Sequence, residues 1–473
     1  MMNMTGPKHS CGVIGMYGAG NVAEDIFKAL RIIQHRGQEG AGISVFDGKR
    51  VVTAKGSGLV HDAINREGLS KLNGVCGIGH ARYPSANTKA EKNAEPIEIE
   101  MTHGVIAMAH NGSITNYHEL KKKYLESGWS FLTDSDSEII SRITAKHLVQ
   151  NNDPVKAIRS TMSEIEGAYC LTVLYNNRVF GVRDPYGFRP LCLGRIQDKG
   201  HIIASETAAI DIFRGEFVRD VMPGEIVEIT ADGFKSHPAP SPCQKAHCMF
   251  EWIYFARPDS MIDGREVYEV RRNVGEILAK EWPADVDLIM PVPDSGRAHA
   301  LGYSIGSKIR YEEGFMKNRF VDRTFILSDQ KQRESAVTMK LNPIRSTVKG
   351  KRVLIVDDSV VRGTTMPRII RMLRDAGAKE GHVRIGCPPI IAPCYYGVDM
   401  KSRDQFIALK YTIEETREQI GADSLGYISI PGLVKAIGKP ESDLCLACLN
   451  SRYPTAIPGE THKYQATLKH TFE

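Results

Sequence analysis

The sequence predicts two domains of different fold class, an α+β domain followed by an α/β domain with a parallel sheet. Its 473 residues exceed what one ordinary hydrophobic core fills. The first half contains many short β segments with few helices, whereas the second half alternates strands and helices. The run Ser236–Pro242, with three prolines, separates the two patterns and places the boundary near residue 241.

Strands in the first half are predicted from short apolar runs bounded by Gly, Pro and Asn turns. They are Gly12–Tyr17, Gly42–Phe46, Gly77–Ala81, Val105–His110, Ala168–Leu174 and Arg178–Arg183. Helical periodicity predicts helices near Ala23–His35 and Ser135–Gln150. Because few helices connect the strands, we expect stacked and mostly antiparallel sheets.

Strands and helices alternate strictly after the linker. The predicted order is helix Val267–Glu281, strand Val286–Pro291, helix His299–Glu312, strand Arg352–Val356, helix Met366–Ala376 and strand His382–Gly386. Such alternation is typical of a parallel sheet with helices on both faces.

Composition excludes some partners. Formal net charge is only +5, and the basic residues are scattered, which argues against nucleic acid but allows a local site for an anionic small molecule. No apolar run approaches the roughly 20 residues that span a bilayer. Met1–Ser10 is polar and does not resemble a secretory signal, so we expect a cytoplasmic protein without a membrane partner.

The ten cysteines need an explanation other than disulfides, which are rare in the cytoplasm. Five lie among apolar or small residues and are predicted to be inert core thiols: Cys76, Cys170, Cys192, Cys243 and Cys387. Cys445 and Cys448 form a CxxC motif, with Cys248 and Cys394 as available partners. Four thiolates suit a structural zinc or an iron–sulfur cluster, and spacing decides neither the metal nor whether the four meet.

The segment Val353–Thr365 (VLIVDDSVVRGTT) predicts an anion site in the second half. A buried strand ends in Asp357 and Asp358, and a loop rich in Ser, Gly and Thr leads into a helix. Ligands bind at the carboxyl ends of parallel strands, where backbone N–H groups cradle phosphate and carboxylates hold hydroxyls or Mg²⁺. The alternative is a tight turn whose Asp and Thr only cap the next helix.

These thirteen residues resemble the diphosphate-ribose signature of the type I phosphoribosyltransferases. The resemblance implies that phosphoribosyl pyrophosphate is bound by Asp357, Asp358, Ser359, Arg362, Gly363, Thr364 and Thr365. It places Ser295, in the pyrophosphate-facing loop Pro291–Gly296, on the Mg²⁺ side with Asp357 and Asp358. Arg319–Asn342 resembles the mobile flap of that family, with Lys340 as an anion partner.

Cys11 opens an apolar strand directly after the polar leader. If Met1–Ser10 were removed, the free α-amine of Cys11, with a pKa near 8, would take the proton of its own thiol. Arg82 ends a predicted strand, where it could grip a carboxylate. Asn111 and Gly112 supply the two donor types of an oxyanion hole, and Asp136 could cap a helix or meet an ammonium group.

Together with His35–Gly42, these segments resemble the N-terminal-nucleophile glutaminase domain of the class II amidotransferases, an αββα sandwich. The resemblance extends from Cys11 to about residue 235. It implies that Cys11 is the nucleophile, that Asn111 and Gly112 stabilise the oxyanion, and that Arg82 and Asp136 bind glutamine. The predicted organisation is a leader at 1–10, a glutaminase domain at 11–241 and a phosphoribosyltransferase domain at 242–473.

Nearly the whole chain resembles the amidophosphoribosyltransferase family. Cys248–Ser260, Pro388–Asp399, the CxxC motif and the leader resemble its iron–sulfur, Bacillus-type subgroup. The resemblance implies conversion of phosphoribosyl pyrophosphate, glutamine and water to 5-phosphoribosylamine, pyrophosphate and glutamate, the first committed step of purine synthesis. It also implies Mg²⁺, a [4Fe–4S] cluster on Cys248, Cys394, Cys445 and Cys448, purine nucleotides as feedback inhibitors, and a homodimer or homotetramer.

Ammonia must then travel between two sites, and we expect Arg36 and Tyr254 at the interface that encloses its path. Two alternatives stay open: another amidotransferase, such as a glucosamine-phosphate or asparagine synthase, and a non-enzymatic regulator that senses nucleotides. The phosphoribosyl loop opposes the first alternative. The intact set of Cys11, Arg82, Asn111 and Asp136 opposes the second.

Overall fold

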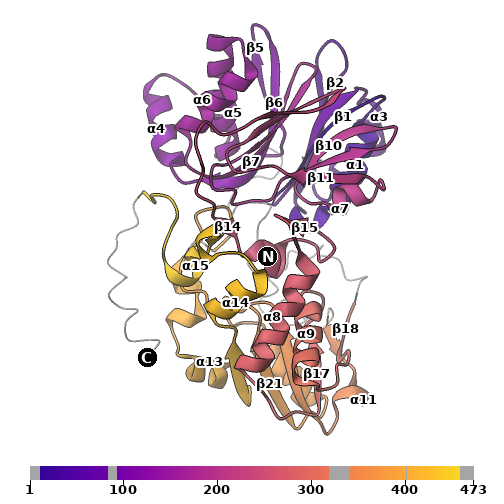
Figure 1. The fold of residues 1–473 in the computed structure, drawn as a ribbon, viewed down its shortest axis with the longest axis vertical. Coiled ribbons are helices and arrows are strands. Elements are labelled where there is room, and N and C mark those ends of the chain that lie inside the picture. The colour runs from indigo at the N-terminus through magenta and orange to yellow at the C-terminus, as the bar shows by residue number, and fades with distance from the viewer. Residues whose placement is uncertain (1–10, 84–92, 319–340, 401, 459–473) are drawn as a thin grey trace.

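The structure is a computed structural model that describes residues 11–83, 93–318, 341–400 and 402–458. Its two halves are stacked end to end (Figure 1), with the N-terminal half at the top of the view. The predicted leader and nearly all of the predicted flap, including Lys340, lie outside the described residues. Among the residues described, no helix has the length and apolar character needed to cross a membrane.

Two antiparallel sheets form the centre of the N-terminal half. One has the order β11-β9-β10-β1-β4-β2-β3, and the other has the order β13-β12-β8-β7-β6-β5. The first contains β1 (Gly12–Gly18), β2 (Gly40–Phe46), β3 (Val51–Ser57), β4 (Cys76–Arg82), β9 (Cys192–Ile196), β10 (Gly200–Ala204) and β11 (Glu216–Asp220). The second contains β5 (Ile97–Met101), β6 (Gly104–Ile114), β7 (Gly167–Tyr175), β8 (Arg178–Arg183), β12 (Ile226–Thr230) and β13 (Gly233–His237).

Three apolar layers hold these sheets together. Val13 lies in the layer between the sheets, whereas Ile14 lies in the layer under α1 (Ala23–Ile32), because successive strand residues point to opposite faces. The outer face of the second sheet packs on α5 (Asp136–Asn151) and α6 (Pro154–Glu164). Helices therefore cover both outer faces, and the predicted αββα sandwich is confirmed.

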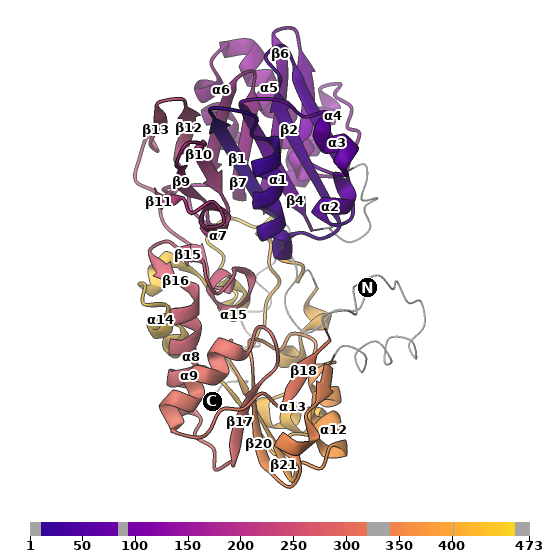
Figure 2. The same ribbon diagram turned by 90° about the vertical axis from the view of Figure 1, so that its right-hand side faces the viewer.

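The C-terminal half is built on a parallel sheet of order β17-β20-β21-β22. Its strands are β17 (Leu288–Pro291), β20 (Arg352–Asp357), β21 (Glu380–Ile385) and β22 (Ser424–Tyr427). Helices α8 (Val267–Glu281) and α9 (Arg297–Ser307) lie on one side of it, and α12 (Met366–Asp375) and α13 (Ile413–Ile420) lie on the other (Figure 2). The predicted α/β domain is confirmed.

Two predicted elements were wrong in extent. The helix predicted over His299–Glu312 ends at Ser307, because Lys308 adopts a left-handed conformation with φ +60°. The following residues run beside β17, where the N–H of Ile289 donates to Arg310 O at 2.8 Å. The predicted linker Ser236–Pro242 begins inside β13, which ends at His237, and β14 (His247–Cys248) is the next strand.

Candidate functional site

Cys11 lies directly before β1, and the pairing of β1 with β4 positions it. Gly12 is opposite Ala81 in that ladder, so Cys11 lies near Arg82 at the end of β4. The side chain is partly buried. Burial, with the nearby Glu95 carboxylate, raises the pKa of the Cys11 thiol to about 11. The thiol is therefore protonated at neutral pH and needs a base before it can act as a nucleophile.

Asn111 and Gly112 lie on β6, and both have features of an oxyanion site. Asn111 is 1% exposed, and its Nδ2 has no hydrogen-bond partner within the described part of the chain. A buried donor without a partner lowers the stability of the fold by about 1–3 kcal/mol, so such a group commonly forms a hydrogen bond to a ligand. Gly112 has φ +147°, and a Cβ there would overlap the Ala168 carbonyl oxygen. Only glycine fits at this position.

Arg82 and Asp136, the two predicted glutamine ligands, flank the thiol. Both are near enough to affect the pKa of Cys11, which Arg82 lowers and Asp136 raises. Arg82 donates a hydrogen bond to the Asn93 carbonyl. The Asp136 carboxylate, in the first turn of α5, accepts the backbone N–H of Ile114 at 3.1 Å. Because Ile114 ends β6, this bond ties Asp136 to the strand that holds Asn111 and Gly112.

Glu95 is a buried carboxylate beside this site that the sequence patterns did not indicate. It accepts the backbone N–H of His110 at 2.7 Å and the Ser137 hydroxyl at 2.7 Å. Burial opposes its ionisation, yet His80, His110 and Arg82 hold the pKa of Glu95 below its usual value. Glu95 therefore supports β6 immediately before Asn111. Its run Asn-Ala-Glu-Pro has no catalytic pattern, so only tertiary contacts could reveal it.

Asp357 and Asp358 are buried where β20 ends. Asp357 Oδ1 accepts the N–H of Asp358 at 2.9 Å, whereas its Oδ2 has no partner among the described residues. Burial and the Asp358 carboxylate raise the pKa of Asp357 well above its usual value, and burial also raises the pKa of Asp358. An unpartnered carboxylate oxygen in an acidic pair fits a cation or a sugar hydroxyl.

The predicted phosphate loop follows this pair and leads into α12. Asp358 accepts hydrogen bonds from the Ser359 hydroxyl, at 2.6 Å, and from Ser295 of the predicted pyrophosphate loop. Gly363 has φ +66°, and a Cβ there would overlap Ile407. Thr365 is buried at the start of α12. Thr364 and Arg362 are exposed, and Arg362 donates to Gln405 at 2.6 Å. The structure thus brings Ser295 to the Asp357–Thr365 loop.

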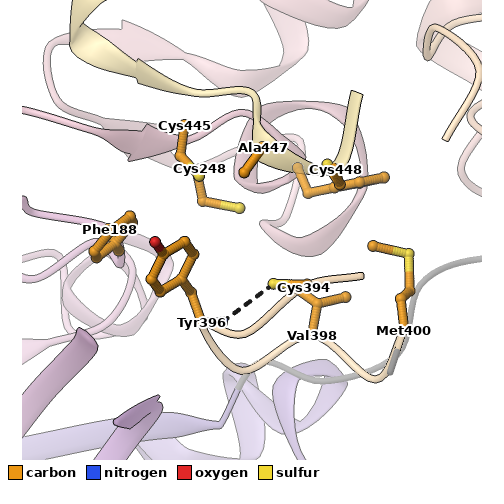
Figure 3. Close-up of a pocket in the computed structure, with 10 residues that line it drawn as sticks. Phe188, Cys248, Cys394, Tyr396, Val398, Met400, Cys445, Ala447 and Cys448 are labelled. Carbon is orange, nitrogen blue, oxygen red and sulfur yellow. Dashed lines mark hydrogen bonds between the residues drawn. The ribbon is translucent and has the colours of Figure 1, made fainter. Parts of the chain in front are cut away.

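Four cysteines from three separate segments line one cavity (Figure 3). β14 pairs in parallel with β23 (Leu444–Cys445), so Cys248 lies opposite Cys445. Cys394 comes from the loop after β21, and Cys448 comes from α15 (Ala447–Asn450). Burial raises the pKa of the Cys248 thiol to about 12. Around the thiols the lining is apolar: Phe188, Phe250, Tyr396, Val398, Met400 and Ala447.

The donor set of this cavity fits a metal centre, because four thiolates gathered at a site with two buried and two partly buried members need a compensating cation. Across the described ranges, however, no three His, Cys, Asp or Glu side chains are arranged to hold a single metal ion. Of the five predicted core thiols, Cys76, Cys170, Cys192 and Cys387 are buried. Cys243 is only partly buried, because it lies in the connection between the two halves rather than in a sheet.

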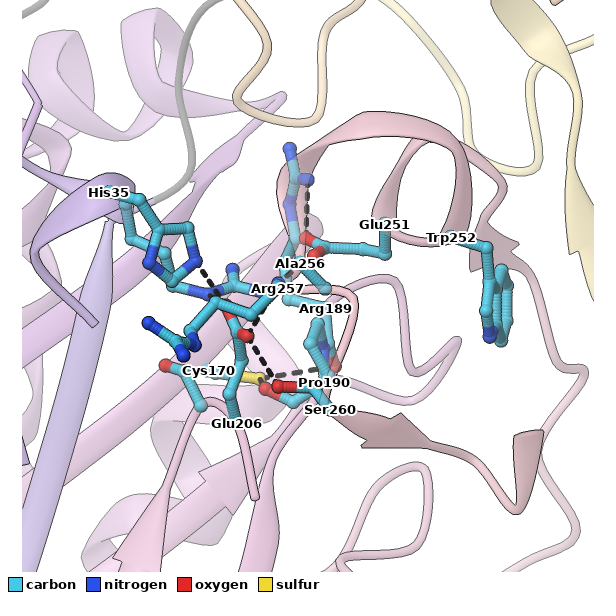
Figure 4. A network of polar contacts seen from close by, with 12 residues as sticks. His35, Cys170, Arg189, Pro190, Glu206, Glu251, Trp252, Ala256, Arg257 and Ser260 are labelled. Carbon is cyan, nitrogen blue, oxygen red and sulfur yellow. Dashed lines mark hydrogen bonds and ion pairs between the residues drawn. The ribbon is translucent and has the colours of Figure 1, made fainter. Parts of the chain in front are cut away.

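A buried group of charged residues joins the two halves (Figure 4). Arg36 forms ion pairs with Glu206 of the N-terminal half and, at 2.7 Å, with Glu251 of the C-terminal half. Arg189 pairs with Glu251 at 3.0 Å and donates to the Tyr396 carbonyl at 2.9 Å. Arg36 is thus an interface residue, as predicted. Tyr254, the other predicted interface residue, packs against the core of the C-terminal half.

Comparisons with known proteins match each half of the chain to a domain family. A family profile described as a glutamine amidotransferase domain matches residues 80–211, and one described as a phosphoribosyl transferase domain matches 266–392. The amidophosphoribosyltransferase of Methanocaldococcus jannaschii is 48% identical, covering 95% of this chain and 98% of its own. That of Methanothermobacter thermautotrophicus is 46% identical, covering 98% and 99%.

Two solved structures are similar over nearly the full length. One is described as the allosteric regulatory enzyme of purine biosynthesis, with TM-score 0.90, 40% identity and coverage of 95% of this chain and 97% of the other. The second is the glutamine phosphoribosylpyrophosphate amidotransferase of B. subtilis complexed with ADP and GMP, with TM-score 0.89, 40% identity and coverage of 95% and 99%. The chain therefore belongs to the amidophosphoribosyltransferase family, the glutamine-dependent enzymes that form 5-phosphoribosylamine from phosphoribosyl pyrophosphate at the first step of purine biosynthesis.

Proposed function

We propose that Cys11 is the nucleophile of the glutaminase half-reaction and that its own α-amine is the base. Removal of Met1–Ser10 would free this amine, whose ordinary pKa near 8 suits proton transfer at neutral pH. The raised pKa of the thiol supports the proposal, because few Cys11 thiolates form without a base. The thiolate attacks the glutamine side-chain amide, forms a glutamyl thioester and releases ammonia, and water then hydrolyses the thioester to glutamate.

The oxyanion of this reaction is assigned to Asn111 Nδ2 and the backbone N–H of Gly112. The unpartnered, buried Nδ2 is the observation that supports this assignment most directly. Arg82 would bind the α-carboxylate of glutamine and Asp136 its α-amine, which places opposite charges of the substrate beside the two charged groups near Cys11.

The second half-reaction is assigned to the loop that follows β20. Ser359, Gly363, Thr364 and Thr365 would surround the 5-phosphate, with Arg362 and Lys340 as further anion partners. Asp357, Asp358 and Ser295 would hold Mg²⁺ and the ribose hydroxyls, since Asp357 Oδ2 has no other partner in the residues described. When bound, Mg²⁺ would neutralise charge on the leaving pyrophosphate, and ammonia would attack C1 of the ribose.

We assign the cavity of Cys248, Cys394, Cys445 and Cys448 to a [4Fe–4S] cluster. A single zinc, with Zn–S bonds of about 2.3 Å, would require all four sulfurs to surround one ion. Four thiols around one cavity without such convergence suit a cluster in which each thiolate binds a different iron. The cluster would be structural, since the cavity is lined by apolar side chains rather than by substrate-binding groups.

Purine nucleotides as inhibitors and a homo-oligomer of two or four chains complete the proposal. The related B. subtilis enzyme is described as complexed with ADP and GMP, which supports nucleotide regulation here.

The assignment of the two half-reactions can be tested with one substitution and two nitrogen sources. Asn111→Ala should lower kcat for glutamine hydrolysis about 10²–10³-fold, because it removes one oxyanion donor. Ammonia-dependent synthesis from phosphoribosyl pyrophosphate should stay at the level of the unsubstituted enzyme. Asn177→Ala, at an exposed position in the turn between β7 and β8 of the same half, is the matched control. Equal losses with glutamine and ammonia would contradict the assignment.

A further inference from the structure

The loop that follows Cys394 reaches from the cysteine cavity to the strand with the oxyanion donors. Gly397 in this loop has φ +100° and lies against Gly112 of β6. A Cβ added to Gly397 would be 2.9 Å from the Gly112 carbonyl carbon and 3.1 Å from its oxygen. Such distances leave no room for a side chain, so the backbone of the C-terminal half directly contacts the glutaminase strand.

Contacts of Tyr396, the residue before Gly397, hold this part of the loop in place. The buried Tyr396 ring stacks on Phe188 of the N-terminal half, with ring centroids 4.1 Å apart and an interplanar angle of 20°. Arg189 donates to the Tyr396 carbonyl at 2.9 Å, and the Tyr396 N–H donates to Cys394 Sγ at 3.4 Å (Figure 3). Tyr396 and Phe188 also share an apolar cluster with Ala168, whose carbonyl confines Gly112.

We propose that Gly397 is a positioning residue for the glutaminase reaction: the C-terminal half holds Gly112 in the conformation that presents its N–H to the oxyanion. This inference rests on the proposed oxyanion role of Asn111 and Gly112. An oxyanion hole is effective only when its donors are preorganised, and glycine at positive φ has more backbone freedom than other residues. The Ala168 carbonyl confines Gly112 from within the N-terminal half, and Gly397 adds a contact from the C-terminal half.

Gly397→Ala tests the inference, and Gly48→Ala is its matched control. Gly48 has φ +96°, close to that of Gly397, but a Cβ there has nothing within 4 Å. Both substitutions therefore introduce similar backbone strain, and only Gly397→Ala adds an atom against Gly112. Glutamine hydrolysis, glutamine-dependent synthesis and ammonia-dependent synthesis should be measured on the full-length, matured enzyme.

Gly397→Ala should lower kcat for glutamine hydrolysis about 10- to 100-fold and leave KM for glutamine within about twofold, because only a transition-state interaction is lost. Ammonia-dependent synthesis should be unchanged, and Gly48→Ala should resemble the unsubstituted enzyme in all three assays. Unchanged hydrolysis, or equal losses with glutamine and ammonia, would overturn the inference.

Two further variants keep the result interpretable. If Asn111→Ala lowers kcat for hydrolysis while Gly397→Ala leaves it unchanged, the positioning role fails and the oxyanion assignment stands. If Asn111→Ala has no effect, the oxyanion assignment itself fails. Should Gly397→Ala not fold, Tyr396→Leu removes the stacking on Phe188 without adding an atom near Gly112. It should show the same kcat loss at about three- to tenfold, and a kcat equal to that of the unsubstituted enzyme would refute the inference.

Discussion

Individual residues of both sites are marked by polar atoms that are buried without a partner. Asn111 Nδ2 and Asp357 Oδ2 belong to this group among the residues described. Each costs the folded protein about 1–3 kcal/mol until a ligand satisfies it. The surroundings of the Cys11 thiol are also unfavourable to its reactive form, since they stabilise the neutral thiol rather than the thiolate. The two buried atoms without partners are therefore destabilising until a ligand binds, as expected of residues that serve function rather than stability.

The raised pKa of Cys11 predicts its reactivity while the leader is attached. Alkylation of Cys11 by iodoacetamide should be slow at pH 7 and rise roughly tenfold per pH unit towards the pKa of about 11, because only the thiolate reacts. Peptide mass mapping after timed alkylation would follow this cysteine separately. The same leader-bearing chain should not hydrolyse glutamine, whereas a chain beginning at Cys11 should. Equal glutaminase activity of the two chains would contradict the α-amine mechanism.

Asp357→Asn should lower activity and raise stability. An acid whose pKa is raised by folding binds its proton more tightly in the folded state, so its ionisation destabilises the protein as the pH rises above the unfolded pKa of about 4. Removing that charge should increase the free energy of unfolding at pH 7 by about 1–2 kcal/mol without Mg²⁺. Ammonia-dependent synthesis should fall at least about 100-fold.

Urea unfolding at pH 7 and pH 5 would check the stability effect of Asp357→Asn. Its gain over the unsubstituted chain should be smaller at pH 5, because the destabilisation caused by a raised pKa of Asp357 diminishes as the pH falls towards the unfolded value. Lower stability of the variant at pH 7, or an unchanged rate of synthesis, would contradict the role given to Asp357.

At the scale of elements, each site is assembled where strands begin or end. Cys11 precedes β1, Arg82 ends β4, and Asp357 ends β20. Strand ends are rigid on one side, because the ladder holds them, and open on the other, where side chains can meet a ligand. The cysteine cavity differs, since its four cysteines lie on short segments with little regular structure of their own.

The cysteine cavity predicts a specific pattern of metal content. Anaerobically purified protein should be brown and contain about four irons per chain. Cys445→Ala should lose most of that iron, because it removes one of the four thiols. Cys170→Ala, which changes a buried thiol outside the cavity, should keep it. Iron analysis and the visible absorption spectrum measure both, and colourless protein with one zinc per chain would contradict the cluster.

For the whole molecule, the buried charges at the interface decide how the two halves fit together. Arg36, Glu206, Glu251 and Arg189 are all buried and come from both halves. Glu206 additionally accepts the Ser260 hydroxyl at 2.7 Å, so its charge is matched from several directions. Buried ion pairs are poor sources of net stability, but their strict geometry makes one relative arrangement of the halves preferable to others.

Arg36→Met should destabilise the protein by about 3–5 kcal/mol, because two buried carboxylates lose their common partner. Arg50→Met is the control, since its side chain is 80% exposed and lies 4.0 Å from Asp47. The control should change stability by less than about 0.5 kcal/mol. Thermal unfolding of both variants beside the unsubstituted chain would show the difference, and equal midpoints would contradict the importance of the interface.

The sequence by itself determined the fold classes, most element positions and the family, and it indicated the residues of both proposed sites. Val353–Thr365 could be interpreted because strand, acidic pair, loop and helix follow one another within one short segment. Hydrophobic periodicity and turn chemistry are local properties, so they can be recognised in the sequence alone. The predicted end of α9 was wrong because Lys308 has a positive φ. A lysine does not indicate that conformation in the sequence.

Only the tertiary structure decided which distant segments meet. It placed Glu95 beside Cys11, brought Cys248 opposite Cys445, and set Gly397 against Gly112. These contacts depend on strand order and on the packing of one half against the other, and neither is encoded by the spacing between residues. The chemistry of each half could therefore be predicted from its sequence, whereas the connection between the halves required the folded molecule.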